Sequence, residues 1–111
     1  MSSRQEKLLR ESRRFSKILA TKSRGYVRST WLFGSLAAGK IHPEDADIGV
    51  EIAPSGAAQS HVVDLIQQIA PHGRFHGIRI DAIIVTPSEL ICGNDFVSRG
   101  IRTHNIRLWP S

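Results

Sequence analysis

The sequence is poor in cysteine, in aromatic residues and in long apolar runs. Of its 111 residues, one is cysteine (Cys92) and 6% are aromatic. A single cysteine cannot form an internal disulfide or a cysteine zinc cluster, which favours the reducing environment of the cytoplasm. No apolar run approaches the roughly 18 residues that a membrane-spanning helix needs, and the polar first residues lack the apolar region of a secretory signal. We therefore expect a cytoplasmic protein with no membrane partner.

The remaining composition is that of an ordinary globular domain. Hydrophobic residues make up 41% of the chain and charged residues 23%, which argues against disorder, collagen and coiled coil. There is no internal repeat and no low-complexity segment. The length predicts a single domain over residues 1–111.

The charge is unevenly distributed along the chain. The net charge of +5 suggests a nucleic-acid-binding protein. Residues 1–30 carry nine basic and two acidic side chains, residues 31–95 carry three basic and eight acidic ones, and residues 96–111 carry three Arg and no acid. Because the middle is acidic, a nucleic-acid-binding interpretation does not fit it, and that segment is where catalytic chemistry is expected.

Three segments have the patterns of strands. Residues 26–33 are rich in β-branched and aromatic residues, and Trp31 within them is expected in the core. Residues 45–52 alternate strictly, so that acids and Gly point one way and aliphatic residues the other. Residues 78–85 form a further strand, with Arg79 and Asp81 on one face.

Apolar residues at helical spacing predict helices around these strands. The helices are expected over residues 3–22, 57–70 and 88–103, the last capped by Ser88. The order of helices and strands predicts a small α/β (α+β) fold, with helices packed on a short sheet.

The acidic strand carries the pattern that points to chemistry. Asp45 and Asp47 lie on one face with Cα atoms roughly 6.5 Å apart. Such neighbours repel each other unless a divalent cation lies between them, and carboxylate oxygens suit Mg²⁺, which takes further oxygens from substrate phosphates. Asp81 would be a third ligand, or a base that accepts a proton from an attacking hydroxyl. Three carboxylates can hold two metal ions for phosphoryl or nucleotidyl transfer.

A phosphate-binding element precedes these acids. At Gly34 the backbone can approach a phosphate closely, and the Ser35 hydroxyl and nearby N–H groups can bind anionic oxygens. Lys40 can neutralise a phosphate or be a solvated surface lysine. An Asp-x-Asp pair on a strand is by itself more often a solvated edge, and Arg79 is expected to form a structural ion pair with Asp81.

Residues 31–52 resemble the signature of minimal nucleotidyltransferases of the DNA polymerase beta superfamily. The segment reads WLFGSLAAGKIHPEDADIGVEI, which matches a pattern of Gly-Ser, about nine to thirteen residues and Asp-x-Asp. The resemblance implies a polymerase-beta-like fold with a short mixed sheet, and an enzyme that uses one or two Mg²⁺ ions to transfer a nucleoside monophosphate, AMP from ATP, to an acceptor hydroxyl. By this resemblance Asp45, Asp47 and Asp81 are the catalytic residues and metal ligands, and Gly34 and Ser35 contact the nucleoside triphosphate.

The resemblance also implies a partner. Small members of this family commonly act as antitoxins that adenylylate an all-helical HEPN-domain toxin, so we expect such a partner or self-association to supply the acceptor. The sequence departs from the family pattern at Ala38, where Arg is usual, and at Ala46 and Gly49. These departures favour, as an alternative, a catalytically weakened module that neutralises a partner by contact alone.

A third alternative rests on the N-terminal helix. Basic residues recur there at spacings of three and four, which places them in one stripe. This stripe is either a solvated face, a contact for nucleic-acid phosphates, or a docking site for an acidic protein; nucleic acid is not the favoured partner. The stripe consists of Arg4, Lys7, Arg10, Arg14 and Lys17.

Overall fold

The computed structural model describes residues 3–34, 45–93 and 105–110. Its central element is a mixed five-stranded sheet with strand order β3-β4-β2-β1-β5. The strands are β1 (Val27–Phe33), β2 (Asp45–Ile52), β3 (Arg74–Phe75), β4 (Ile78–Val85) and β5 (Asn105–Trp109). β2 and β4 are parallel, and the other pairs are antiparallel. The expected α+β class with a short mixed sheet is confirmed.

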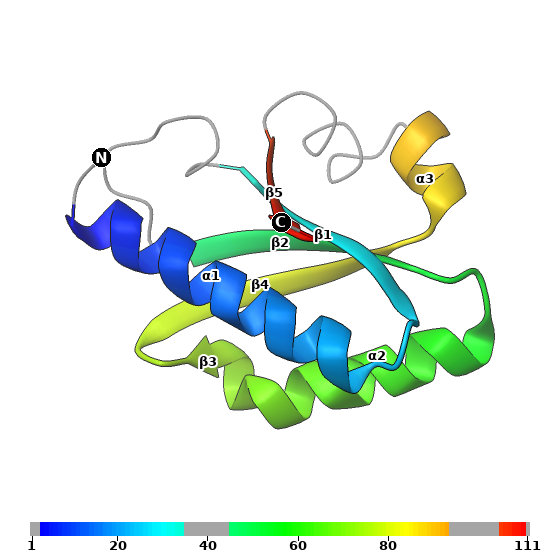
Figure 1. Cartoon of the computed structure of the whole chain (residues 1–111), viewed down its shortest axis with the longest axis horizontal. Coiled ribbons are helices and arrows are strands. Elements are labelled where there is room, and N and C mark those ends of the chain that lie inside the picture. The colour runs from blue at the N-terminus through cyan, green and yellow to red at the C-terminus, as the bar shows by residue number, and fades with distance from the viewer. Residues whose placement is uncertain (1–2, 35–44, 94–104, 111) are drawn as a thin grey trace.

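Two long helices cover one face of this sheet. Helices α1 (Ser3–Lys22) and α2 (Gly56–Ile69) lie side by side there, and the shorter α3 (Pro87–Cys92) stands apart from both (Figure 1). The chain from β2 through α2 to β4 is the crossover that a parallel strand pair requires. None of the helices in the described ranges is long and apolar enough to cross a membrane.

The main core lies between the two long helices and the sheet. The alternation of β2 sends its aliphatic residues into this core and leaves its acids on the opposite face. The largest fully buried apolar side chains of the core are Phe15, Leu19, Val27, Leu32, Ile48, Val50, Ile52 and Val62.

The opposite sheet face, which we call the open face, carries a smaller apolar cluster. Phe33 and Val85 are buried there, and the half-buried Trp31 and Ile83 pack against them. Trp31, which was expected in the core, is half-buried and packs in this smaller cluster, because the register of β1 turns its side chain away from the long helices.

The C-terminal third differs most from the sequence prediction. The last helix begins after Thr86 rather than Ser88, because Thr86 and Glu89 form a capping box around Pro87. It ends at Cys92, since the backbone of Gly93 is extended. Residues 94–103 of the predicted helix lie outside the described residues. The strands β3 and β5 were not predicted.

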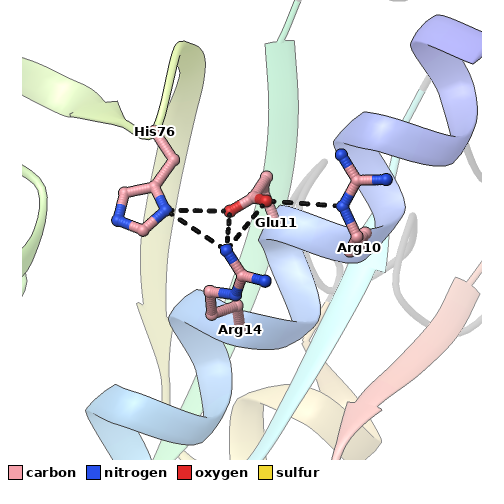
Figure 2. A network of polar contacts seen from close by, with 4 residues as sticks. All are labelled: Arg10, Glu11, Arg14 and His76. Carbon is pink, nitrogen blue, oxygen red and sulfur yellow. Dashed lines mark hydrogen bonds and ion pairs between the residues drawn. The ribbon is translucent and has the colours of Figure 1, made fainter.

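A buried carboxylate fixes the hairpin of β3 and β4 to α1. Glu11 is 4% exposed and accepts from Arg14 Nη1 at 3.2 Å and from Arg10 Nε at 3.5 Å (Figure 2). Nδ1 of His76, in the hairpin turn, lies 3.2 Å from the same carboxylate and 3.5 Å from Arg14 Nη1. Nδ1 of His76 can either donate to Glu11 or accept from Arg14, whose nitrogens only donate. A proton on Nδ1 satisfies the shorter of the two contacts, the one to Glu11. Charge-assisted contacts therefore hold helix and hairpin together.

Candidate active site

The strand β2 places two of the predicted site residues on the open face. Asp45 and Asp47 are half-buried, while Ala46 between them and Ile48 after them are fully buried in the main core. The small Ala46 thus has a structural role on the core face of β2. The strict alternation of the sequence is confirmed as the reason that both carboxylates share one face.

The third predicted carboxylate lies directly beside this pair. In the parallel register of β2 and β4, Asp81 is opposite Asp47, and Arg79 is opposite Asp45. Neighbouring strands lie about 4.8 Å apart, so the backbones that carry Asp47 and Asp81 are at that separation. Asp81 is exposed, whereas Asp47 is half-buried. The fold therefore brings all three acids to one patch of the open face.

The electrostatics of this patch are unfavourable for a charged Asp47. Burial raises the pKa of the Asp47 carboxyl, and the negative charges of Asp81 and then Asp45 raise it further. Among the described residues, neither Asp47 nor Asp81 has a hydrogen-bond or ion-pair partner. The expected ion pair of Arg79 with Asp81 was therefore wrong. The apolar cluster contributes to this environment, because its Phe33 is the strand partner of Asp47.

Gly34 follows the last residue of β1 and lies against the carboxylate of Asp47. Its φ of +80° lies in the region that favours glycine. A Cβ atom at this position would collide with Oδ2 of Asp47 and lie 3.2 Å from its Cγ. Only a glycine therefore lets the backbone lie against the Asp47 carboxylate at this position. A backbone that binds a phosphate beside the acids needs such a close approach. Ser35 and Lys40, the other predicted nucleotide-binding residues, lie outside the described residues.

The three acids suit a hard divalent cation. Within the described ranges, no group of three or more His, Cys, Asp or Glu side chains is arranged to hold a metal ion by itself. Mg²⁺ does not need such a cage, because it is usually bound by one or two carboxylates, several waters and substrate phosphates. The facing pair of Asp47 and Asp81 offers that number of ligands, and a cation beside them would offset the repulsion that raises the Asp47 pKa.

A fourth acid of the open face is already engaged. Glu51 accepts a hydrogen bond from Ser29 Oγ at 2.7 Å, and Ser29 Oγ accepts one from Trp31 Nε1 at 2.8 Å. The guanidinium of Arg107 lies 5.5 Å from the centre of the Trp31 ring. Glu51 therefore shares the open face with the three acids but has a structural role, because its carboxylate is hydrogen-bonded to Ser29.

Sequence reasoning missed a basic cavity next to the acids. Arg74 and Arg79, which flank the turn of the β3–β4 hairpin, line it together with Arg4 and Lys7 of α1. Asp45 lines it as well. The basic stripe of α1 indicated two of these residues, Arg4 and Lys7. The two arginines of the hairpin come beside them only through tertiary packing, which the sequence pattern does not show.

No family model and no curated protein matches the chain. Among solved structures, the chain is similar to a crystal structure of a mutant of the toxin–antitoxin complex MntA–HpeT, with 16% identity and a TM-score of 0.46, over 84% of this chain and 68% of that one.

Proposed function

We propose that the chain is a Mg²⁺-dependent nucleotidyltransferase that moves a nucleoside monophosphate, AMP from ATP, to an acceptor hydroxyl. One observation carries the proposal: Asp47 and Asp81 face each other across parallel strands, with the backbone of Gly34 against the Asp47 carboxylate. Neither acid has a partner among the described residues, so the patch is free to take a cation and phosphate oxygens.

Each site residue has a distinct role in this reaction. Asp47 and Asp81 would hold Mg²⁺, with Asp45 as the third carboxylate. The bound cation would neutralise charge that develops on the phosphate oxygens. The backbone at Gly34, with the predicted contacts of Ser35 and Lys40, would bind the triphosphate.

The proposed transfer forms one bond and breaks one. The acceptor oxygen bonds to the α-phosphorus, the bond from that phosphorus to the α,β-bridging oxygen breaks, and pyrophosphate leaves. Asp81 is the exposed carboxylate of the patch, which supports a second role for it: one of its oxygens would hold the cation, and the other would accept the proton of the acceptor hydroxyl. Asp47, the more buried acid, is suited to holding the cation.

The acceptor in this proposal is a hydroxyl of a second protein chain. The motif resemblance supports an antitoxin that adenylylates an all-helical HEPN-domain toxin; self-association is the other arrangement. Asp81 is exposed on the sheet face opposite α1 and α2, which supports a docked partner there.

The experiment is transfer of label from α-³²P-ATP to a purified HEPN-domain protein, the partner class that the motif resemblance implies. We expect Mg²⁺-dependent labelling that falls more than about 100-fold in Asp47→Asn, because loss of even an outer-shell residue costs up to about 100-fold. The exposed Asp64→Asn of α2 is the matched control and should label as the wild type does. Tight binding of the partner without labelling would refute the enzyme and favour the module that acts by contact alone.

The nucleic-acid alternative has less support. Arg10 and Arg14 of the basic stripe are paired with the buried Glu11, so they do not extend the stripe as free charges. Salt-dependent RNA binding that falls when Arg10 and Arg14 are both replaced would nevertheless favour that alternative over the enzyme.

A further inference from the structure

A basic cavity lies between the first half of α1 and the β3–β4 hairpin. Its volume is about 450 Å³, and four cationic side chains line it: Arg4, Lys7, Arg74 and Arg79. One carboxylate, Asp45, also lines it. The cations therefore outnumber the acid four to one around a space as large as many small-molecule sites.

The four cations take no part in the ion pairs that the structure describes. Within the described part of the chain, none of them forms an ion pair, whereas Arg10 and Arg14 on the same helix do. Like charges around one cavity repel each other, and an anion in the cavity would turn that repulsion into attraction. Within the basic stripe of α1, Arg10 and Arg14 therefore pair with Glu11, whereas Arg4 and Lys7 line the cavity.

Specific contacts position the hairpin wall of the cavity against α1. The Glu11 contacts with Arg14 and His76 fix the hairpin turn on α1 (Figure 2). At the next residue, Gly77, φ is +84°, and a Cβ atom there would lie 3.0 Å from Nζ of Lys7. The lysine therefore lies close over the hairpin backbone, which places its charge at the wall of the cavity.

We infer that this cavity binds phosphate groups of a ligand other than the donor nucleotide. Three of the four cations are arginines. One planar guanidinium group can donate two parallel hydrogen bonds to two oxygens of the same phosphate. Gly34, which would contact the donor triphosphate, is not among the lining residues. Because the cavity reaches Asp45 of the proposed active site, the bound ligand would be the acceptor of the reaction or an effector of it. This role rests on the proposed function, whereas the binding of phosphate does not.

The test measures binding of inorganic tripolyphosphate by titration calorimetry, with EDTA present and at low salt. The variant Lys7→Gln/Arg74→Gln removes one cation from each wall of the cavity, and we expect its dissociation constant to rise at least tenfold. The charge-matched control Arg13→Gln/Lys17→Gln alters exposed positions of α1 that do not line the cavity, and its constant should change less than twofold. Arg4→Gln alone should weaken binding threefold or more.

The outcomes separate the sources of the phosphate. A single-stranded RNA of ten nucleotides, measured by fluorescence anisotropy, should lose affinity in the same variant if the ligand is a nucleic-acid backbone, and should be unaffected if it is a small polyphosphate. Equal weakening in the variant and its control, or no binding by the wild type, would overturn the inference. Because the tripolyphosphate titration contains neither nucleoside nor Mg²⁺, its result does not depend on whether the protein transfers nucleotides. Asp47→Asn should retain tripolyphosphate binding.

Discussion

Replacement of Asp47 by Asn should stabilise the metal-free protein at neutral pH. The side chain keeps its shape but loses a charge that faces Asp81 across neighbouring strands. At a separation of about 4.8 Å, Coulomb's law gives roughly 0.9 kcal/mol in water and roughly 3.5 kcal/mol at an effective dielectric constant of about 20. Because Asp81 is exposed, the lower end applies, and we expect a gain of about 1 kcal/mol.

The pH dependence of this gain follows from the raised pKa of Asp47. Its carboxyl binds a proton more tightly in the folded state than at its ordinary pKa of 3.8. The stability of the wild type therefore falls as the pH rises above 3.8 through the raised value, and the loss persists at neutral pH. The Asn variant lacks this loss, so the difference between the two proteins should open above pH 4 and close below it.

The assay is urea unfolding followed by tryptophan fluorescence between pH 3 and 8. Added Mg²⁺ at ten times its dissociation constant should stabilise the wild type by about 1.4 kcal/mol and leave the Asn variant nearly unchanged. Asp64→Asn, on the exposed side of α2, is the control and should show neither effect. A loss of more than 1 kcal/mol in Asp47→Asn at pH 7, or equal stabilisation of both proteins by Mg²⁺, would refute the reasoning.

Three further substitutions test the structure around the site by urea unfolding. Gly34→Ala combines a positive φ with a collision at Asp47 and should cost at least about 1 kcal/mol more than Gly25→Ala, which has the same backbone strain but open space; equal costs would contradict the contact. Glu11→Gln removes the charge that pairs with two arginines and should cost about 1.5–3 kcal/mol, with a loss below 0.5 kcal/mol as the contrary result. Ser16→Ala removes a buried hydroxyl that lacks a hydrogen-bond partner among the described residues and should add up to about 1 kcal/mol, whereas a clear loss would show that the hydroxyl is bonded.

The elements with long, regular patterns were predictable from the sequence. The strands Asp45–Ile52 and Ile78–Val85 were predicted to the residue, because alternation and β-branched runs mark their limits. The strand Arg74–Phe75 is too short to carry a pattern. The strand Asn105–Trp109 alternates over only five residues, which leaves little signal. The predicted helix over residues 88–103 ran past Gly93, where the extended backbone ends α3.

The faces of the site were predictable, but its contacts were not. Alternation places Asp45 and Asp47 on one side of a strand, and the same argument gives the side of Asp81. The parallel register that sets Asp81 opposite Asp47, and Arg79 opposite Asp45, depends on how two distant segments pair. Without that register, Arg79 was expected to pair with Asp81, when it in fact lines the basic cavity.

Calorimetric titration of a non-hydrolysable ATP analogue, with and without Mg²⁺, tests the central claim most directly because it needs no acceptor. If the acids on the open face form a Mg²⁺–nucleotide site, Mg²⁺ tightens binding of the analogue at least tenfold in the wild type and in Asp64→Asn, and Asp47→Asn loses this gain. No gain from Mg²⁺ in the wild type, or an equal gain in Asp47→Asn and the wild type, would contradict the account.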